Sequence, residues 1–258
     1  MRVLVTNDDG VGTRGILELA RTVHELGHDV VVAAPREEAS GASASLTSVQ
    51  KDGRTVVEPR SLDGLDAVPV FGVAASPAFI SLIALRGAFG DAPEMVVSGI
   101  NEGPNTGRAV IHSGTVGAAL TAATYGARGL AVSIELGQPR HWSTAHELIR
   151  AGVSALAAAP QGTTLNLNVP NRPAGEVLGL RSARLAPFGT VQARIAESGE
   201  GYVKLAYTEP AEEAPPDSDA ALLAEGYATI TALQPTAEVL LEDLENLLVI
   251  PTSTSGGG

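Results

Sequence analysis

The sequence predicts an α/β fold with a mostly parallel sheet, helices on both of its faces, and a C-terminal extension containing strands and a helix. Two observations predict it. Short runs that are apolar throughout alternate along the chain with segments of helical periodicity. Strands without polar alternation are typical of a parallel sheet that is buried on both faces. The 258 residues, 44% of them hydrophobic and 18% charged, suffice for one large core.

The first elements alternate from the start of the chain. Residues 2–6 form a short β-rich run that ends in polar residues, which predicts a buried strand. Residues 15–26 place apolar side chains at helical spacing and predict a helix. Residues 29–34 and 68–73 predict the second and third strands. Residues 77–86 predict a helix, because a proline stands near the start, where the first helical turn tolerates it.

The alternation continues through the middle of the chain. Residues 95–98 predict a fourth strand, and the Ala-rich residues 115–125 predict a helix. Residues 130–134, 144–158 and 165–169 follow as strand, helix and strand. Because ligands of parallel sheets bind at the carboxyl ends of strands, we expect function in the polar clusters that follow these runs.

The regular alternation of strands and helices ends after residue 170. Residues 179–207 contain short β-like runs, residues 209–219 read as an acidic, Pro-rich loop, residues 226–233 as a strand and residues 238–248 as a helix. We therefore expect a core over residues 1–170, an extension over residues 171–250 that continues it, and a flexible tail over residues 251–258.

Charge and cysteine content exclude several classes of function. Seventeen basic residues against 29 acidic ones give a net charge of −12, so a nucleic acid polymer is an unexpected partner. The absence of cysteine excludes disulfides, thiolate-bound zinc and thiol catalysis. No apolar run is long enough to cross a membrane, and no signal-peptide segment precedes the first polar cluster. We expect a cytoplasmic protein that does not bind membranes.

Two motifs have alternative interpretations. Gly10, Gly12 and Gly15 match the dinucleotide fingerprint G-x-G-x-x-G, but Asp8 and Asp9 would repel a pyrophosphate. We therefore expect these glycines to serve a tight turn and close helix packing. Residues 24–28 match the zinc-protease pattern H-E-x-x-H, yet a helix end at residue 27 would place the second histidine outside the helix.

The strongest chemical signal is the pair Asp8 and Asp9 after the first strand. Adjacent buried carboxylates repel each other and lose solvation, and a divalent cation relieves both costs. Small and hydroxyl-bearing residues over 40–45, Asn101 in a Gly- and Asn-rich loop, and the helix start at residues 113–115 add oxygen ligands and backbone amides. An all-oxygen set prefers hard cations such as magnesium or manganese to zinc.

These segments resemble the SurE family of metal-dependent nucleotidases, also called survival proteins. Four blocks in order carry the resemblance: VTNDDG at residues 5–10, SGAS at 40–43, VSGIN at 97–101 and SGTVGAA at 113–119. The resemblance implies a Rossmann-like catalytic core, hydrolysis of nucleoside 5′- and 3′-monophosphates, and homodimers or homotetramers built through the C-terminal half. It also implies metal ligands at Asp8, Asp9, Ser40 and Asn101.

The sequence departs from the family's pattern at residues 76–79, Arg108, His112 and Thr121. Because the implied metal ligands are intact, these departures bear on substrate preference and catalytic rate. They leave open which base is preferred and whether the 5′ or 3′ phosphate is.

Our hypothesis from the sequence is a phosphomonoesterase that uses Mg²⁺ or Mn²⁺ to act on small nucleotides. Asp8, Asp9 and Asn101 are the expected catalytic residues. The expected phosphate contacts are Ser43, Asn105, Ser113, Gly114 and Thr115. The alternative is a sugar-nucleotide-binding protein of the glycosyltransferase type, because residues 12–35 resemble the first unit of those enzymes, which have two Rossmann-like lobes.

Overall fold

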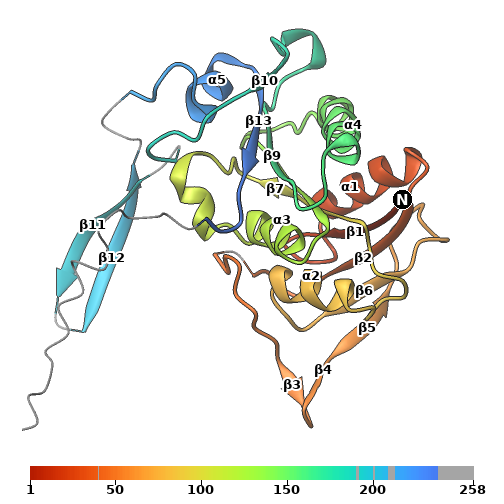
Figure 1. Ribbon diagram of the computed structural model, residues 1–258. Coiled ribbons are helices and arrows are strands. Elements are labelled where there is room, and N and C mark those ends of the chain that lie inside the picture. Colours follow the sequence, from red (N-terminus) through yellow and green to blue (C-terminus); the bar gives the residue numbers. More distant parts are fainter. Residues whose placement is uncertain (40, 190–191, 200, 209–212, 238–258) are drawn as a thin grey trace, which may run out of the picture.

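The main body of the protein is one nine-stranded sheet, seen in a computed structural model that describes residues 1–39, 41–189, 192–199, 201–208 and 213–237 (Figure 1). The strand order is β10-β13-β9-β8-β7-β1-β2-β6-β5. These strands are β1 (Arg2–Thr6), β2 (Asp29–Pro35), β5 (Val57–Arg60), β6 (Val70–Val73), β7 (Met95–Glu102), β8 (Arg128–Ile134), β9 (Thr164–Val169), β10 (Leu180–Ser182) and β13 (Ala228–Leu233).

Two pairs of helices cover the two faces of this sheet (Figure 1). α1 (Arg14–Glu25) and α4 (Trp142–Ala158) pack on one face, and α2 (Pro77–Leu85) and α3 (Gly114–Thr124) pack on the other. The predicted layered α/β fold is confirmed.

Side-chain alternation along the buried strands builds both layers. Val3 and Val5 of β1 belong to the core beneath α1 and α4, whereas Leu4 belongs to the core beneath α2. All three are fully buried. Because successive side chains of a strand point to opposite faces, a central strand covered on both sides must be apolar throughout. That requirement explains why these runs could be read from the sequence.

In the order of the sheet, the six neighbouring strands β9, β8, β7, β1, β2 and β6 are parallel. Both ends of the sheet contain an antiparallel pair. β5 pairs antiparallel with β6 at one edge, and β13 pairs antiparallel with β9 near the other. The sequence did not predict β5, the small hairpin of β3 (Gln50–Lys51) and β4 (Arg54–Thr55), or the short helix α5 (Asp219–Glu225). β3, β4 and β5 are mostly exposed and therefore lack an apolar pattern.

The C-terminal half contributes strands to the main sheet and also forms a separate hairpin outside it. β10 and β13 lie at one edge of the sheet, beside β9. The division at residue 170 stays a prediction. β11 (Gln192–Gly199) and β12 (Tyr202–Thr208) form a separate antiparallel hairpin that projects from the body (Figure 1). The predicted helix at 238–248, the tail at 251–258 and part of the loop at 209–219 lie outside the described residues.

The structure confirms the structural interpretation of the G-x-G-x-x-G and H-E-x-x-H matches. Gly10 adopts φ +109° in the turn after β1, and a Cβ on Gly15 would lie 2.3 Å from the carbonyl oxygen of Ile100. The glycines thus serve a turn and the close packing of α1 on β7. Helix α1 ends at Glu25, so His28 lies outside it. Over the described ranges, no helix has both the length and the apolar character to cross a membrane.

Candidate active site

The predicted site residues converge where the order of the sheet reverses. β1 pairs with β2 on one side and with β7 on the other, both parallel. The chain therefore moves outward through β2 and β6 and then returns to place β7 beside β1. Such switch points, at the carboxyl ends of the strands, are where open α/β sheets bind ligands. Asp8 and Asp9 follow β1 there, Asn101 lies near the end of β7, and α3 begins at Gly114.

A polar turn presents the two carboxylates. The side chain of Asn7 is fully buried. Its Oδ1 accepts from the backbone N–H of Gly10 at 3.1 Å, and its Nδ2 donates to the carbonyl of Gly10 at 2.9 Å and to Oγ1 of Thr13 at 3.0 Å. Every polar atom of this side chain is engaged, which holds the Asp8–Asp9 turn rigidly between β1 and α1.

Asp8 is held against the first turn of α3. Its side chain is 4% exposed. The hydroxyl of Thr115 donates to Oδ1 at 2.5 Å, and the backbone N–H of Thr115 donates to Oδ2 at 3.2 Å. Burial raises the pKa of Asp8, and the Thr115 hydroxyl opposes that shift. The helix N-terminus and these two donors thus stabilise an ionised Asp8 that has left water.

Asp9 lies in a strongly acidic environment. Burial raises the pKa of Asp9 to about 6, with further contributions from Asp8, Glu102 and Glu38. Among the ion pairs of the described residues, none joins Asp8 or Asp9 to Lys, Arg or His. Glu102 is paired with Arg140, whereas Asp8 and Asp9 have no such ion pair among the described residues. A divalent cation would stabilise these two adjacent carboxylates.

Asn101 supplies the neutral oxygen of the predicted ligand set. A register irregularity in the pairing of β7 with β8 falls between Ser98 and Asn101. The Nδ2 atom of Asn101 donates to the carbonyl of Gly103 at 2.6 Å, so Oδ1 is the atom suited to a metal. Two hydroxyls next to this region, on Thr6 and Ser98, are buried without a hydrogen-bond partner among the described residues.

The loop after Asn101 is fixed by asparagines from β9. The backbone N–H of Asn105 donates to Oδ1 of Asn168 at 2.8 Å, and its carbonyl accepts from Asn166 at 2.8 Å and from Asn168 at 2.9 Å. The Nδ2 atom of Asn105 donates to Ser133 at 2.8 Å. Both β9 asparagines are fully buried. Sequence reasoning missed their role, although two asparagines at alternate positions of a buried strand were a usable signal.

The other predicted phosphate contacts lie around the start of α3. Ser113 is the N-cap of α3, and its hydroxyl accepts from the N–H of Val116 at 3.2 Å. The hydroxyl of Ser43 donates to the carbonyl of Ile111, just before α3, at 2.6 Å. Ser40 lies outside the described residues. The roles of Ser113 and Ser43 toward phosphate, and of Ser40 toward a metal, stay predictions.

Among the described residues, the donors available to a metal are therefore two carboxylates and one amide oxygen. Ser40 stays a predicted fourth ligand. Within the part of the chain that the structure describes, no group of three or more His, Cys, Asp and Glu residues is arranged to hold a metal ion. A hard cation suits this all-oxygen set, and a site with few protein ligands leaves positions for water and phosphate oxygens.

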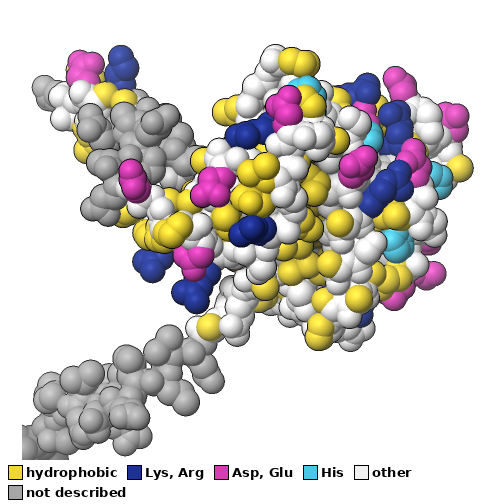
Figure 2. Space-filling view, turned by 90° about the horizontal axis from the view of Figure 1, so that it is seen from above, with side chains coloured by type: hydrophobic (Ala, Val, Ile, Leu, Met, Phe, Trp, Pro, Cys, Tyr) yellow, Lys and Arg dark blue, Asp and Glu magenta, His cyan; other side chains and the backbone are white. Residues whose placement is uncertain are grey.

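On the face shown in Figure 2, the Lys and Arg side chains of the coloured region lie singly or in small groups among acidic and apolar ones.

Comparison with known proteins identifies the family. Residues 3–190 match the family described as survival protein SurE. The chain is 36% identical over 239 residues to the 5′-nucleotidase SurE of Gloeobacter violaceus, covering 91% of this chain and 90% of that protein. It is 37% identical over 238 residues to the 5′/3′-nucleotidase SurE of Erwinia tasmaniensis, covering 90% of each.

A solved structure shows the same fold. The crystal structure of the SurE protein from Aquifex aeolicus matches with a TM-score of 0.74 and 28% identity, covering 92% of this chain and 95% of that one. The site geometry described above lies within the matched region. The chain therefore belongs to the SurE family.

Proposed function

We propose that this protein is a metal-dependent phosphomonoesterase that hydrolyses nucleoside 5′- and 3′-monophosphates to nucleoside and phosphate. The relatives named above are a 5′-nucleotidase and a 5′/3′-nucleotidase. The observation that carries the proposal is the buried Asp8, which sits beside Asp9 at the N-terminus of α3 without a basic partner among the described residues.

The proposed metal is Mg²⁺ or Mn²⁺, with Asp8, Asp9, Asn101 and Ser40 as its ligands. Such an ion supplies Lewis-acid polarisation of the phosphoryl group and lowers the pKa of water. The uncompensated negative charge at Asp8 and Asp9 and the oxygen-only donors support this choice.

Side chains and backbone groups of the protein orient the water and bind the phosphate. Asp8 is oriented by Thr115, so its carboxylate stays fixed during turnover. Asp9 is the more exposed of the two, which supports giving it the role of orienting the attacking water and accepting its proton. The start of α3, at Ser113, Gly114 and Thr115, stabilises the negative charge of the phosphate oxygens. Ser43 and Asn105 stay predicted phosphate contacts.

We further propose a homodimer or homotetramer built through residues 171–250. The hairpin of β11 and β12 stands clear of the body (Figure 1) and exposes Ile195, Tyr202 and Val203, which are 67%, 51% and 60% accessible. Large apolar side chains exposed on a projecting hairpin favour contact with another copy of the chain. The cytoplasmic location stays a prediction.

The glycosyltransferase alternative finds no support. Those enzymes need a second Rossmann-like lobe, whereas the main body described here is one sheet with β10 and β13 at its edge. The relatives reported above are nucleotidases.

A phosphate-release panel tests the proposal. The purified protein is assayed with nucleoside 5′- and 3′-monophosphates, first in EDTA and then with added magnesium or manganese. We expect no release in EDTA and restored release with either metal. Release that persists in EDTA, or none with any metal, would contradict the proposal.

A further inference from the structure

The connection from β7 to α3 contains a 3₁₀ helix, η1 (Gly107–His112), which lies between the predicted phosphate contacts Asn105 and Ser113. The carbonyl of Ile111, within η1, accepts a hydrogen bond from the hydroxyl of Ser43 at 2.6 Å. Ser43 is a third predicted phosphate contact. The position of η1 therefore affects where these three polar side chains lie relative to one another.

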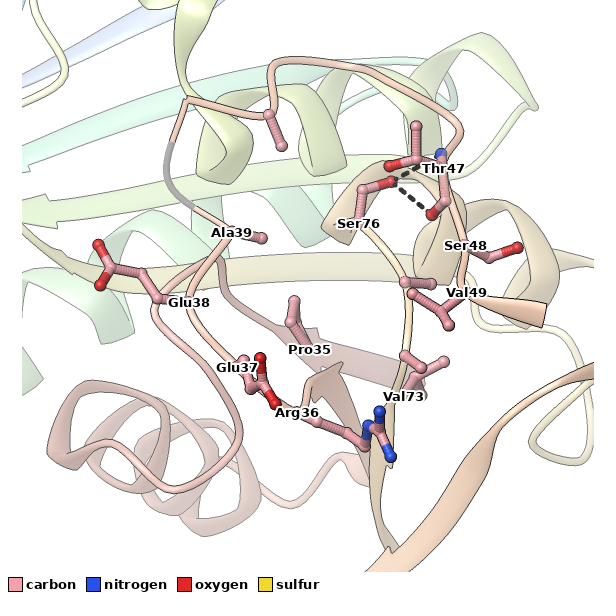
Figure 3. Close-up of a pocket in the computed structure, with 13 residues that line it drawn as sticks. Pro35, Arg36, Glu37, Glu38, Ala39, Thr47, Ser48, Val49, Val73 and Ser76 are labelled. Carbon is pink, nitrogen blue, oxygen red and sulfur yellow. Dashed lines mark hydrogen bonds between the residues drawn. The ribbon is translucent and has the colours of Figure 1, made fainter. Parts of the chain in front are cut away.

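The loop after β2, which carries Ser43, is held by contacts outside η1. The hydroxyl of Ser76 donates to the carbonyl of Ser45 at 2.5 Å and accepts from the N–H of Thr47 at 3.2 Å (Figure 3). A Cβ on Gly117 of α3 would lie 2.2 Å from the carbonyl oxygen of Ser43, so this loop packs directly against α3. The loop is thus a fixed partner for η1.

Asp219, the first residue of α5, binds the start of η1 from the C-terminal half of the chain. Its side chain is fully buried. Oδ2 accepts from the backbone N–H of Gly107 at 2.9 Å, and Oδ1 accepts from the N–H groups of Ala186 and Ala220 at 2.9 Å each. The carbonyl of Ala186 in turn accepts from the N–H of Arg108 at 3.1 Å. One carboxylate thus joins the start of η1 to two C-terminal segments.

The contact at Gly107 leaves no room for a side chain. Gly107 adopts φ +61°, and a Cβ there would lie 2.1 Å from the carbonyl oxygen of Phe188. Asp219 takes no part in the ion pairs of the described residues, so the partners of its buried carboxylate there are backbone N–H groups. Close packing and this carboxylate together fix η1 against the segment before β11.

We infer that Asp219 is a positioning residue for the phosphate site, acting through Gly107 and η1. The inference rests on the proposed function, because it concerns phosphate binding at that site. A buried carboxylate is costly to desolvate, and backbone donors offset the cost only while their segments keep these positions. Asp8 and Asp9 lie outside this chain of contacts, since Thr115 of α3 holds Asp8. Asp219 should therefore affect phosphate affinity more than metal affinity.

Two binding constants measured on one variant separate these effects. An amide has a single acceptor oxygen, so Asp219→Asn can keep the bonds to Ala186 and Ala220 but turns an N–H toward that of Gly107. We expect the dissociation constant for inorganic phosphate, measured by calorimetry at saturating Mg²⁺, to rise about tenfold. The constant for Mn²⁺ should change less than about twofold. With a nucleoside monophosphate, KM should rise while kcat stays nearly constant, because the lost contacts bind ground state and transition state alike.

Ser218→Ala is the matched control. The hydroxyl of Ser218 caps α5 by accepting from the N–H of Ala221 at 3.4 Å, so this variant weakens the same helix and keeps the hydrogen bonds of Asp219. Its phosphate constant should equal that of the wild type.

Gly107→Ala tests the same contact from the side of η1. The new methyl group would push the carbonyl of Phe188 away, so this variant should reproduce the loss of phosphate affinity. It decides the question alone if Asp219→Asn does not fold.

The outcomes separate the inference from the proposed function. Unchanged phosphate affinity in both Asp219→Asn and Gly107→Ala would overturn the inference, as would an equal loss in Ser218→Ala, a parallel loss of Mn²⁺ affinity, or a wild type that binds no phosphate. Phosphate binding that depends on Asp219, in a protein that hydrolyses no nucleotide, would overturn the function and support the positioning role. Nucleotide hydrolysis with phosphate affinity independent of Asp219 would do the reverse.

Discussion

Thr115 binds the carboxylate of Asp8 twice, through its hydroxyl at 2.5 Å and its backbone N–H at 3.2 Å. These contacts join residues that are 107 positions apart and connect the end of β1 to the first turn of α3. Burial raises the pKa of Asp8, and the two Thr115 donors oppose that shift, as does the N-terminus of α3.

Removing the Thr115 hydroxyl is expected to weaken metal binding. A hydrogen bond to a charged group contributes about 1.5–3 kcal/mol, so Thr115→Val should raise the dissociation constant for Mn²⁺ about tenfold or more. Calorimetric titration measures the constant. Thr115→Ser keeps the hydroxyl and should bind like the wild type. Equal affinity in the valine variant would show that the hydroxyl does not support Asp8.

Neutralising the carboxylate pair is expected to abolish activity without harming the fold. Asp8→Asn and Asp9→Asn should release no phosphate above background. In the metal-free state at neutral pH, Asp9→Asn should melt a few degrees higher than the wild type, because it removes a carboxylate whose pKa is raised to about 6 by burial and by its acidic neighbours. Calorimetry and a phosphate assay check both points. Asp91→Asn, at an exposed position, is the matched control; wild-type turnover in either site variant would contradict the proposed role.

Metal binding is expected to stabilise the folded protein. At a concentration of Mn²⁺ one hundred times the dissociation constant, the gain is about 2.7 kcal/mol, or about 5–10 °C in Tm for a chain of this size. Differential scanning calorimetry with and without EDTA measures it. The shift should vanish in Asp8→Asn, and a shift of equal size in that variant would place the ion elsewhere.

Disrupting the β9 asparagines is expected to loosen the loop from Asn101 to Gly107. Asn168→Ala removes an acceptor for the N–H of Asn105 and a donor to its carbonyl. The unfolding free energy should fall by about 2–3 kcal/mol, because buried backbone groups lose their partners. The dissociation constant for Mn²⁺ should rise as Asn101 loses its position. Asn168→Asp keeps the acceptor and should retain more affinity; an unchanged constant in both variants would separate this network from the site.

The buried carboxylate of Asp219 is expected to make stability depend on pH. It is fully buried and accepts from the N–H groups of Gly107, Ala186 and Ala220 at 2.9 Å each. Burial still raises the pKa of Asp219 above its usual value. The folded state therefore holds the proton more tightly than the unfolded one, and this residue's contribution to stability decreases as pH rises above about 4.

Urea unfolding from about pH 4.5 to 7 can isolate that contribution. The difference in unfolding free energy between wild type and Asp219→Asn should shift against the wild type as pH rises, with the slope ending above the folded pKa. A difference that is constant with pH would show that Asp219 has the same pKa in both states.

The α/β core was accessible to sequence reasoning because its central strands are buried on both faces and because α1 and α4 are amphipathic. Residues such as Val3, Leu4 and Val5 carry that information locally. β5 and the β3–β4 hairpin have no such pattern, since they lie exposed near one edge of the sheet. The antiparallel placement of β13 beside β9 also had no local signature, because either direction buries the same side chains.

The sequence by itself determined the fold class, the family and the residue types suited to a hard metal, because periodicity and short motifs are local properties. Only the tertiary structure decided that Thr115 holds Asp8, that burial and the nearby acidic side chains raise the pKa of Asp9, and that Asn166 and Asn168 fix the loop after Asn101. Those relationships arise from the crossover that returns β7 to the side of β1. Contacts between residues far apart in the chain depend on this topology, which no local stretch of sequence encodes.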